Sequence, residues 1–265
     1  MKVAVLGPEY SYSHLAGRNI FSDEDLNFYE RIEDIFTAVT TERAAKGIIP
    51  IENMIEGTVR ESIKGLLKHT VKVNEAYTMP IHHCLAAQGD DYQIIISHPQ
   101  ALSQCSAFLA GKKIMESMST AKAMKTAAED HRYAAIGSRE AAEYHSLPIL
   151  KHDIEDNHDN VTRFLVISLE ELIATGENTR TSILLKPKED KPGLLFYMLA
   201  PFAVQNINLA KIESLPSGRK MGEYVFYVEI DGSVQEERVK SALNFLRNSV
   251  DVHSLGSYQV KDLKL

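Results

Sequence analysis

A short segment near the middle of the chain, Asp156–Ile167, carries residue types that could do chemistry. Turn-forming residues lead into Thr162 and Arg163, and an apolar run with strand propensity begins at Phe164. This order predicts a hydroxyl and a guanidinium side by side where a strand meets a loop, a usual place for ligand chemistry. Taken alone, the two residues are about equally well explained as a turn hydroxyl and a surface cation.

Composition narrows the class of protein and its partners. The 265 residues suffice for two domains, and 44% hydrophobic with 25% charged residues is ordinary for a soluble globular protein. A net charge of -7 argues against nucleic acid or an anionic membrane as partner, so the cationic field for any anionic ligand must be local. No apolar run approaches the about 20 residues of a membrane span, and Met1–Gly7 is too short for the apolar region of a signal peptide.

The two cysteines, Cys84 and Cys105, lie far apart in the sequence and lack metal-ligand spacing. We interpret them as reduced, partly buried thiols of a cytoplasmic protein, with a disulfide as the lesser alternative. The sequence also has no glycine-rich phosphate loop and no metal triad. We therefore expect neither a metal nor a cofactor.

Up to about residue 168, short apolar runs alternate with helical patterns, which predicts an α/β fold with mainly parallel sheets covered by helices. The predicted strands are Val3–Gly7, Gly47–Ile51, Gln93–Ile96, Tyr133–Gly137 and Phe164–Ile167. The segment Val71–Ala87 is too long for one βα unit, so we expect it to carry the chain from one lobe into another. Thr162 would then lie on the return path.

The pattern changes after a polar, glycine-containing link at Leu169–Arg180. The elements expected beyond it are a strand, a helix, two strands, a helix and a strand, over Thr181–Leu185, Pro192–Val204, Leu209–Ser214, Tyr224–Ile230, Glu236–Leu246 and Val250–Val260. This βαββαβ order predicts a small α+β domain of the ferredoxin-like type.

Polar residues follow several predicted strands, where open α/β sheets bind their ligands. They include Ser11, Tyr12, Ser13, Glu52, Asn53, Ser97, Gln100, Ser119, Thr120 and Ser138. Several sit at helix starts, where free backbone N–H groups and the helix dipole favour an anion. Any one serine taken singly is more often a plain helix cap, so the convergence is what predicts a site. We interpret His14 and His98 as structural hydrogen-bonding residues.

Four spaced motifs resemble those of the prephenate dehydratase family: Gly7-Pro8-Glu9-Tyr10-Ser11-Tyr12-Ser13-His14, Ile49-Pro50-Ile51-Glu52-Asn53-x-x-Glu56-Gly57, Ser97-His98-Pro99-Gln100-Ala101-Leu102-x-Gln104-Cys105 and Asn160-x-Thr162-Arg163-Phe164. The resemblance implies a two-lobed catalytic domain like the periplasmic-binding proteins over residues 1–170, with lobes of about 1–78 plus 160–170 and 79–159. It places the active site in the cleft and makes Thr162 the residue on which activity depends most. Two departures, Met54 for serine and Tyr10-Ser11 for Gly-Thr, fall on positions that line that cleft.

The implied reaction removes the ring carboxylate of prephenate as carbon dioxide while its ring hydroxyl departs, giving phenylpyruvate. Thr162 would donate a hydrogen bond to the leaving oxygen, and Arg163 would anchor a carboxylate unless its side chain points to the opposite face of its strand. The expected catalytic residues are Thr162, Arg163, Asn53, Ser97 and Gln100. The expected substrate-binding residues are Ser11, Tyr12, Ser13, Glu52, Ser119, Thr120, Ser138, Asn160 and Phe164. Arogenate dehydratase and a non-catalytic two-lobed binding protein are the alternatives.

The C-terminal part, residues 181–265, resembles the ACT regulatory domain through Pro192–Leu199 and Ile212–Pro216. The resemblance implies L-phenylalanine as effector, bound between paired copies in a homodimer or homotetramer. The expected effector residues are Gly193, Leu194, Leu195, Asn206, Ile207, Asn208, Leu209, Glu213 and Ser214. Leu194 departs from the usual alanine and Leu215 from the usual arginine. A degenerate module that serves only dimerisation is the alternative.

Overall fold

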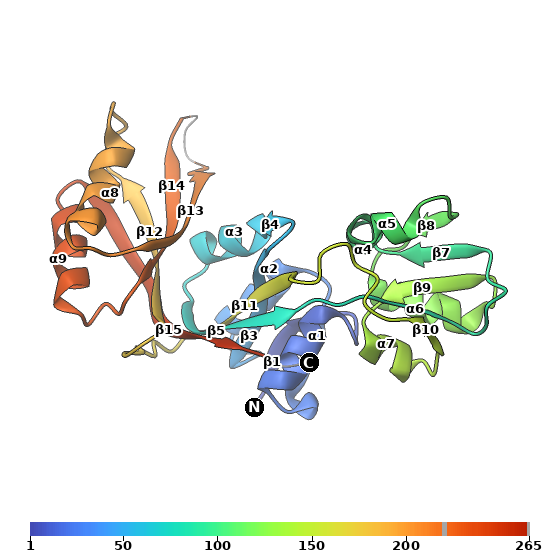
Figure 1. Ribbon diagram of the computed structural model, residues 1–265. Helices are drawn as coiled ribbons and strands as arrows, with labels where there is room; N and C mark the ends of the chain where they lie inside the picture. The colour runs from blue at the N-terminus through green and yellow to red at the C-terminus, as the bar shows by residue number, and fades with distance from the viewer. Residues whose placement is uncertain (219–221, 264–265) are drawn as a thin grey trace.

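The computed structural model describes residues 1–218 and 222–263 and divides the chain into three parts. Figure 1 shows them along one line, with the C-terminal module at one end, a first lobe in the middle and a second lobe at the other end. The two-lobed arrangement predicted for the catalytic part is confirmed. In the described part of the chain, no helix is long and apolar enough to cross a membrane.

The first lobe is built on a mixed sheet. Its strands are β1 (Val3–Leu6), β2 (Leu26–Tyr29), β3 (Lys46–Asn53), β4 (Gly57–Thr58), β5 (Lys72–Pro80) and β11 (Val161–Ser168). Its helices are α1 (Tyr12–Ile20), α2 (Ile32–Thr40), α3 (Arg60–Lys68) and the 3-10 turn η1 (Asp23–Asp25). β1 runs parallel to β2 and β3, whereas β11 runs antiparallel to both β3 and β5. The expectation of a mainly parallel sheet is therefore wrong here, because β11 enters on the return path.

The second lobe has a five-stranded sheet in the order β10-β6-β9-β7-β8. Its strands are β6 (Cys84–Ala87), β7 (Ile94–Ser97), β8 (Ile114–Glu116), β9 (Tyr133–Gly137) and β10 (Ile149–Lys151). Its helices are α4 (Pro99–Gln104), α5 (Ser106–Leu109), α6 (Thr120–Glu129) and α7 (Arg139–Tyr144). The chain leaves the first lobe after β5 and comes back before β11, as predicted from Val71–Ala87.

The C-terminal module has the predicted βαββαβ order. Its elements are β12 (Thr179–Pro187), α8 (Leu194–Val204), β13 (Leu209–Pro216), β14 (Tyr224–Asp231), α9 (Glu237–Leu246) and β15 (Val250–Asp262). The strands are antiparallel to their neighbours in the order β13-β14-β12-β15, and the two helices pack on one face. β12 begins at Thr179, inside the segment predicted as a link.

The module and the first lobe share one sheet, which the sequence did not predict. β15 pairs in parallel with β5, from Gln259 beside Glu75 to Asp262 beside Thr78, and this joins ten strands. At the crossing, Gly256 has φ +141°, and a Cβ atom there would stand 2.2 Å from the Val73 carbonyl oxygen. Glycine therefore permits the close approach of the two parts.

One apolar core continues across this junction. Leu165 and Ile167 of β11 belong to the same buried cluster as Leu184, Leu215 and Tyr227 of the module. The outer face of the module's sheet is thus covered by the first lobe, while the inner face packs on α8 and α9. This packing brings β13 and β14 beside the end of β11, where the candidate site begins.

Candidate active site

Asn53 and Thr162 form a cross-strand pair at the ends of β3 and β11. The Asn53 Nδ2 donates to Thr162 Oγ1 at 3.0 Å and to Asn160 Oδ1 at 2.9 Å. The Asn53 Oδ1 in turn accepts from the backbone N–H groups of Ile55 and Glu56, both at 3.0 Å, so the amide is fixed in orientation. Because the threonine oxygen accepts a hydrogen bond, it keeps its own proton to donate to a ligand.

A chain of polar contacts leads from this pair into the second lobe. Asn160 Nδ2 donates to Gln104 Oε1 at 3.3 Å, and the same oxygen lies 3.0 Å from His83 Nε2. His83 Nδ1 is 2.9 Å from Tyr12 Oη, which also donates to the His82 carbonyl at 2.6 Å. Residues of both lobes and of both connecting segments therefore meet at one place.

The ionisation of this chain is set by burial. Burial lowers the pKa of His83, although the hydrogen bond to Gln104 opposes this. Burial also raises the pKa of Tyr12 well above its ordinary value. Both groups are therefore neutral at pH 7, so neither ring supplies a charge to the site. Within the described part of the chain, Gln104 Nε2 is buried without a hydrogen-bond partner, so one donor of this chain of contacts is left unsatisfied.

The serines predicted at helix starts are helix caps in the structure. Ser11, Ser119 and Ser138 each accept a hydrogen bond from a backbone N–H three residues on, at 3.3, 3.0 and 3.2 Å. Ser13 is buried as the second residue of α1, Thr120 is the first residue of α6 and Gln100 is the second residue of α4. These residues lie after β1, β7, β8 and β9, at the carboxyl ends where an anion site was expected.

Two of the expected site residues take structural positions instead. Ser97 is fully buried, and its hydroxyl donates to the Ile136 carbonyl at 2.6 Å, which ties β7 to β9. Phe164 is buried in the apolar core of the first lobe with Val3 and Leu15. Each side chain faces the interior of a lobe, and the catalytic role of Ser97 and the substrate contact of Phe164 stay predictions.

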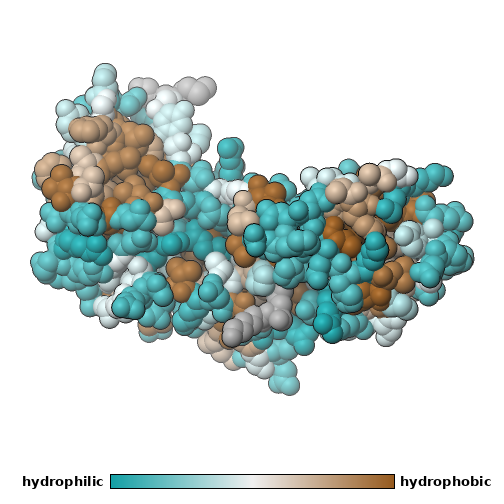
Figure 2. All heavy atoms as spheres, in the orientation of Figure 1, coloured by the Kyte–Doolittle hydropathy of each residue, from teal (hydrophilic) through white to brown (hydrophobic). Residues whose placement is uncertain are grey.

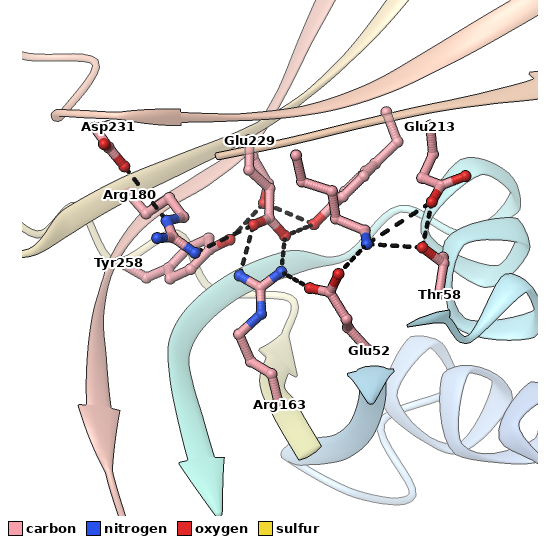
Figure 3. A network of polar contacts seen from close by, with 11 residues as sticks. Glu52, Thr58, Arg163, Arg180, Glu213, Glu229, Asp231 and Tyr258 are labelled. Atoms are coloured by element: carbon pink, nitrogen blue, oxygen red, sulfur yellow. Dashed lines mark hydrogen bonds and ion pairs between the residues drawn. The ribbon is translucent and has the colours of Figure 1, made fainter. Parts of the chain in front are cut away.

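Arg163 and Glu52 also point away from Thr162. Side chains alternate along a strand, and the guanidinium of Arg163 faces the C-terminal module. Its Nη1 and Nη2 donate to the two carboxylate oxygens of Glu229 on β14 at 2.5 and 3.0 Å, and Nη2 also donates to Glu52 at 2.9 Å (Figure 3). The structure thus places Arg163 on the opposite face of its strand, which was the alternative orientation, while the roles expected of Arg163 and Glu52 toward the substrate stay predictions.

The Arg163 pair belongs to a larger group of charges. Lys211 on β13 donates to Glu52 at 2.8 Å and to Thr58 at 2.7 Å, and Thr58 donates to Glu213 (Figure 3). Burial alone would lower the pKa of Arg163, but the Glu229 carboxylate raises it overall. Burial would likewise raise the pKa of Glu52, yet Lys211 and Arg163 lower it overall. Arg163 and Glu52 are therefore both charged at pH 7.

The acidic residue Glu155 joins the two segments that connect the lobes, one with His82 and His83 and the other with His158. Its carboxylate accepts from the His83 backbone N–H at 2.8 Å and lies 2.8 Å from His82 Nδ1 and 3.3 Å from His158 Nδ1. His82, Asp153 and Glu155 also place one ligand atom each within 4.8 Å of one another, as a metal site would require. Because Glu155 is buried and already bonded to three groups, we interpret the cluster as a structural tie between the lobes.

The predicted effector segments lie at the two ends of α8. Gly193 precedes the helix with φ +82°, and Asn206 follows it with φ +52°. A helix of 11 residues is about 16 Å long, so Gly193–Leu195 and Asn206–Leu209 are separated within one chain. Glu213 faces Thr58 of the first lobe and Ser214 is exposed. Leu215, which replaces the usual arginine, is buried in the core shared by the two parts.

Comparison with known proteins settles the family. Residues 3–172 match the family model described as prephenate dehydratase, and residues 189–248 match that of the ACT domain. The chain belongs to the prephenate dehydratase family. It is 40% identical to a bifunctional chorismate mutase/prephenate dehydratase of Aquifex aeolicus, over 97% of this chain and 73% of that protein. It is 37% identical to a prephenate dehydratase of Methanocaldococcus jannaschii, over 96% of this chain and 97% of that protein.

A solved structure of the family has the same fold. The prephenate dehydratase of Arthrobacter aurescens in complex with L-Phe superposes with a TM-score of 0.89 and 28% identity, covering 98% of this chain and 90% of that one. That relative therefore shares the overall fold of this chain, over nearly its whole length. Of the residues now seen at the site, Gln104 stood inside a quoted motif, whereas nothing in the sequence pointed to His83, Lys211 or Glu229.

Proposed function

We propose that this prephenate dehydratase family member converts prephenate into phenylpyruvate for phenylalanine synthesis, with Thr162 as the central catalytic residue. The single observation that carries the proposal is the Asn53–Thr162 pair. A fixed amide holds a hydroxyl whose proton is free to reach a ligand between the lobes. The family match over residues 3–172 supports the same reaction.

The reaction needs a site that favours departure of two groups at once. The bond from the ring to its carboxylate breaks and leaves its electron pair in the ring, carbon dioxide departs, and the ring carbon–oxygen bond breaks with its electron pair on oxygen. The leaving hydroxide takes up one proton and becomes water, while the ring becomes aromatic. A hydrogen bond from Thr162 to the departing oxygen is strongest in the transition state, so it lowers the barrier.

The substrate's two carboxylates need donors, and the chain supplies them with few formal cations. The free N–H groups at the starts of α1, α6 and α7 favour anions, and these helices follow strand ends in both lobes. Gln104 Nε2 adds one buried donor beside Asn160. This arrangement suits an acidic protein of net charge -7, since the field that attracts the dianion is local.

The direct test is formation of phenylpyruvate when the purified protein is mixed with prephenate at neutral pH. Arogenate is offered in a parallel assay, because an amino group in place of the keto oxygen changes neither the ring nor its leaving groups. Faster turnover of arogenate would move the assignment to arogenate dehydratase. Binding of prephenate without any product would favour a non-catalytic binding protein.

For the ACT module we propose L-phenylalanine as a feedback inhibitor, bound at a seam between two chains. The separation of Gly193–Leu195 from Asn206–Leu209 supports this, since only a second copy could bring the two segments together. A cavity of about 1100 Å³ beside the module is lined by Leu194 and Pro216, one residue from each of the two effector motifs. The L-Phe complex of the Arthrobacter aurescens relative supports the identity of the effector.

We further propose that the protein assembles as a homodimer or homotetramer through α8. Phe196 and Val204 are 71% and 80% exposed, and Leu195 and Tyr197 beside them are also exposed. Figure 2 shows apolar side chains gathered over this end of the module. A contiguous apolar surface of this kind is typical of an interface. Light scattering should give a multiple of the 29.6 kDa chain mass, and Phe196→Glu should lower it.

The cellular location we propose is the cytoplasm. Both cysteines, Cys84 and Cys105, are free and buried, and burial raises the pKa of each thiol to about 12. Such thiols remain protonated and unreactive in a reducing compartment. Labelling with a thiol reagent before and after unfolding tests whether both thiols are free and buried, since two reactive groups should be found only in the unfolded chain.

A further inference from the structure

We infer that a group of four charged residues, the partly exposed Glu52 and the buried Arg163, Lys211 and Glu229, transmits the state of the ACT module to Thr162. We call this group the charge bridge. The inference rests on the proposed feedback inhibition and names the side chains that would carry it. Arg163 is then a positioning residue, because it acts on the substrate only through its neighbour Thr162.

The first step is the pairing of β3 with β11. Thr162 lies opposite Asn53, and Arg163 lies opposite Glu52, on consecutive rungs of the same two strands. The pair of Thr162 and Asn53 is the proposed catalytic pair, and the pair of Arg163 and Glu52 belongs to the charge bridge. Because the two pairs share a backbone, a shift of Arg163 or Glu52 moves Thr162 and Asn53 as well. A register shift between Arg163 and Phe164 leaves Ile51 of β3 as an extra residue directly beside these two rungs, and strands bend at such bulges.

Arg163 and Glu52 both have ion-pair partners on the ACT module. Glu229 lies on β14 and Lys211 on β13, whereas Glu52 and Arg163 lie on the first lobe. Figure 3 shows the guanidinium of Arg163 in contact with the carboxylates of both Glu229 and Glu52. Lys211 donates to the other carboxylate oxygen of Glu52 at 2.8 Å. Any movement of β13 or β14 relative to the first lobe must therefore lengthen or remake these contacts.

Burial makes the contacts within the charge bridge sensitive to small movements. The Glu229 side chain is fully buried and that of Arg163 is 8% exposed, while Lys211 is 6% exposed. Tyr227 also donates to Glu229 at 2.6 Å within the same interior. Charges in such surroundings are poorly screened, so a loss of geometry changes their energy more than it would at a surface.

The charge bridge also contacts the effector motif Ile212–Pro216, through Thr58 and Glu213. Glu213 lies two residues after Lys211 on β13, and it accepts a hydrogen bond from Thr58. Thr58 lies on β4, which pairs with the end of β3 so that Thr58 stands opposite Glu52. A ligand that shifts the motif around Glu213 therefore pulls on both Lys211 and Thr58, and each of these contacts leads to the end of β3.

The test separates binding of phenylalanine from its effect on catalysis. Lys211→Met removes one charge from the bridge, and Lys211→Arg restores a cation that can still reach Glu52. In each variant, titration calorimetry gives the affinity for phenylalanine, and kcat and KM are measured with and without it. The matched control is Lys125→Met, which removes an exposed lysine–glutamate pair with Glu129 on α6 of the second lobe.

We expect Lys211→Met to bind phenylalanine within about threefold of the parent affinity while its inhibition at saturation falls at least about fivefold, since coupling between sites commonly spans about 5- to 150-fold. The loss should appear in kcat rather than KM, because Thr162 acts on the departing group. Lys211→Arg should recover most of the inhibition, and Lys125→Met should behave like the parent.

Unaltered inhibition in Lys211→Met would overturn the inference, because the bridge would then be a structural contact only. If phenylalanine gives neither heat nor inhibition in the parent protein, the proposed effector fails, and the transmission inferred from it fails too. Should Lys211→Met not fold, Arg163→Lys takes its place, since it keeps the buried charge but loses the two-point contact with Glu229. Full inhibition in that variant would overturn the inference equally.

Discussion

Thr162 and Arg163 are consecutive residues of β11 that serve different parts of the molecule. The hydroxyl of Thr162 contacts Asn53 at the junction of the two lobes, while the guanidinium of Arg163 pairs with Glu229 of the ACT module. The alternation of side chains along a strand places them on opposite faces. A single dipeptide therefore joins the candidate catalytic site to the module expected to regulate it.

The first prediction concerns the threonine hydroxyl. Thr162→Val should fold and bind prephenate but lose about 2 to 4 kcal/mol of transition-state stabilisation in kcat, as is usual for loss of one positioned donor. Thr162→Ser, which retains the hydroxyl, should be much milder. Steady-state kinetics on both variants decide the point, and near-parental turnover in Thr162→Val would remove the role.

The second prediction concerns the unpartnered amide of Gln104. Gln104→Glu keeps the oxygen that accepts from Asn160 but replaces the buried donor Nε2 with an acceptor. A carboxylate facing a dianionic substrate should raise KM by about tenfold or more, since like charges brought together are costly. Gln88→Glu, a surface change in the second lobe, is the matched control. Equal KM values in the two variants would show that Gln104 does not face the substrate.

The third prediction concerns the stability of the Arg163–Glu229 pair. Breaking a buried ion pair on one side leaves an uncompensated charge, so Glu229→Leu should lower the free energy of unfolding by about 3 to 5 kcal/mol. The double variant Arg163→Met with Glu229→Leu should lose less than the sum of the single changes, because no charge is then stranded. Urea unfolding of all four proteins gives the coupling energy. Simple additivity would mean that the pair is not mutually stabilising.

The fourth prediction concerns pH. Burial depresses the pKa of His83 below its ordinary 6.5, so the unfolded chain takes up a proton that the folded chain does not. His83 therefore contributes stability above about pH 6.5, and this contribution is lost as the pH falls toward the folded value. The gap in melting temperature between the parent and His83→Asn should be wide at pH 7.5 and narrower at pH 5.5. A gap that is constant with pH would contradict this, and the exposed His131→Asn serves as control.

Most helices and strands followed from the sequence because their apolar periodicity is strong. The predicted strand Val3–Gly7 is β1, and the predicted βαββαβ order of the module is confirmed. β2 was not predicted, since its four residues Leu26–Tyr29 give too short a run to separate from a loop. The pairing of β15 with β5 was out of reach for a different reason. It depends on how two separately folded surfaces meet, which no local pattern records.

The site was predictable in its residue types but only partly in its geometry. Asn53, Thr162 and Asn160 stood in the quoted motifs, and the structure brings them into contact. For Arg163 the alternation of side chains left two faces open, and the choice between them depended on where the ACT module lies. His83 and Glu229 gave no signal because each acts through a partner that is distant in the sequence, Gln104 and Arg163 respectively.

The parallel pairing of β15 with β5 bears on how such proteins can be re-engineered. A regulatory part joined by a flexible tether can be exchanged like a cassette, but here the last strand of the chain completes the sheet of the first lobe. A chimaera carrying another protein's effector module would have to supply a strand of matching register, a glycine equivalent to Gly256 and a buried acid opposite Arg163. The design of such a chimaera would therefore begin with the pairing of β15 and β5 rather than with the ligand pocket.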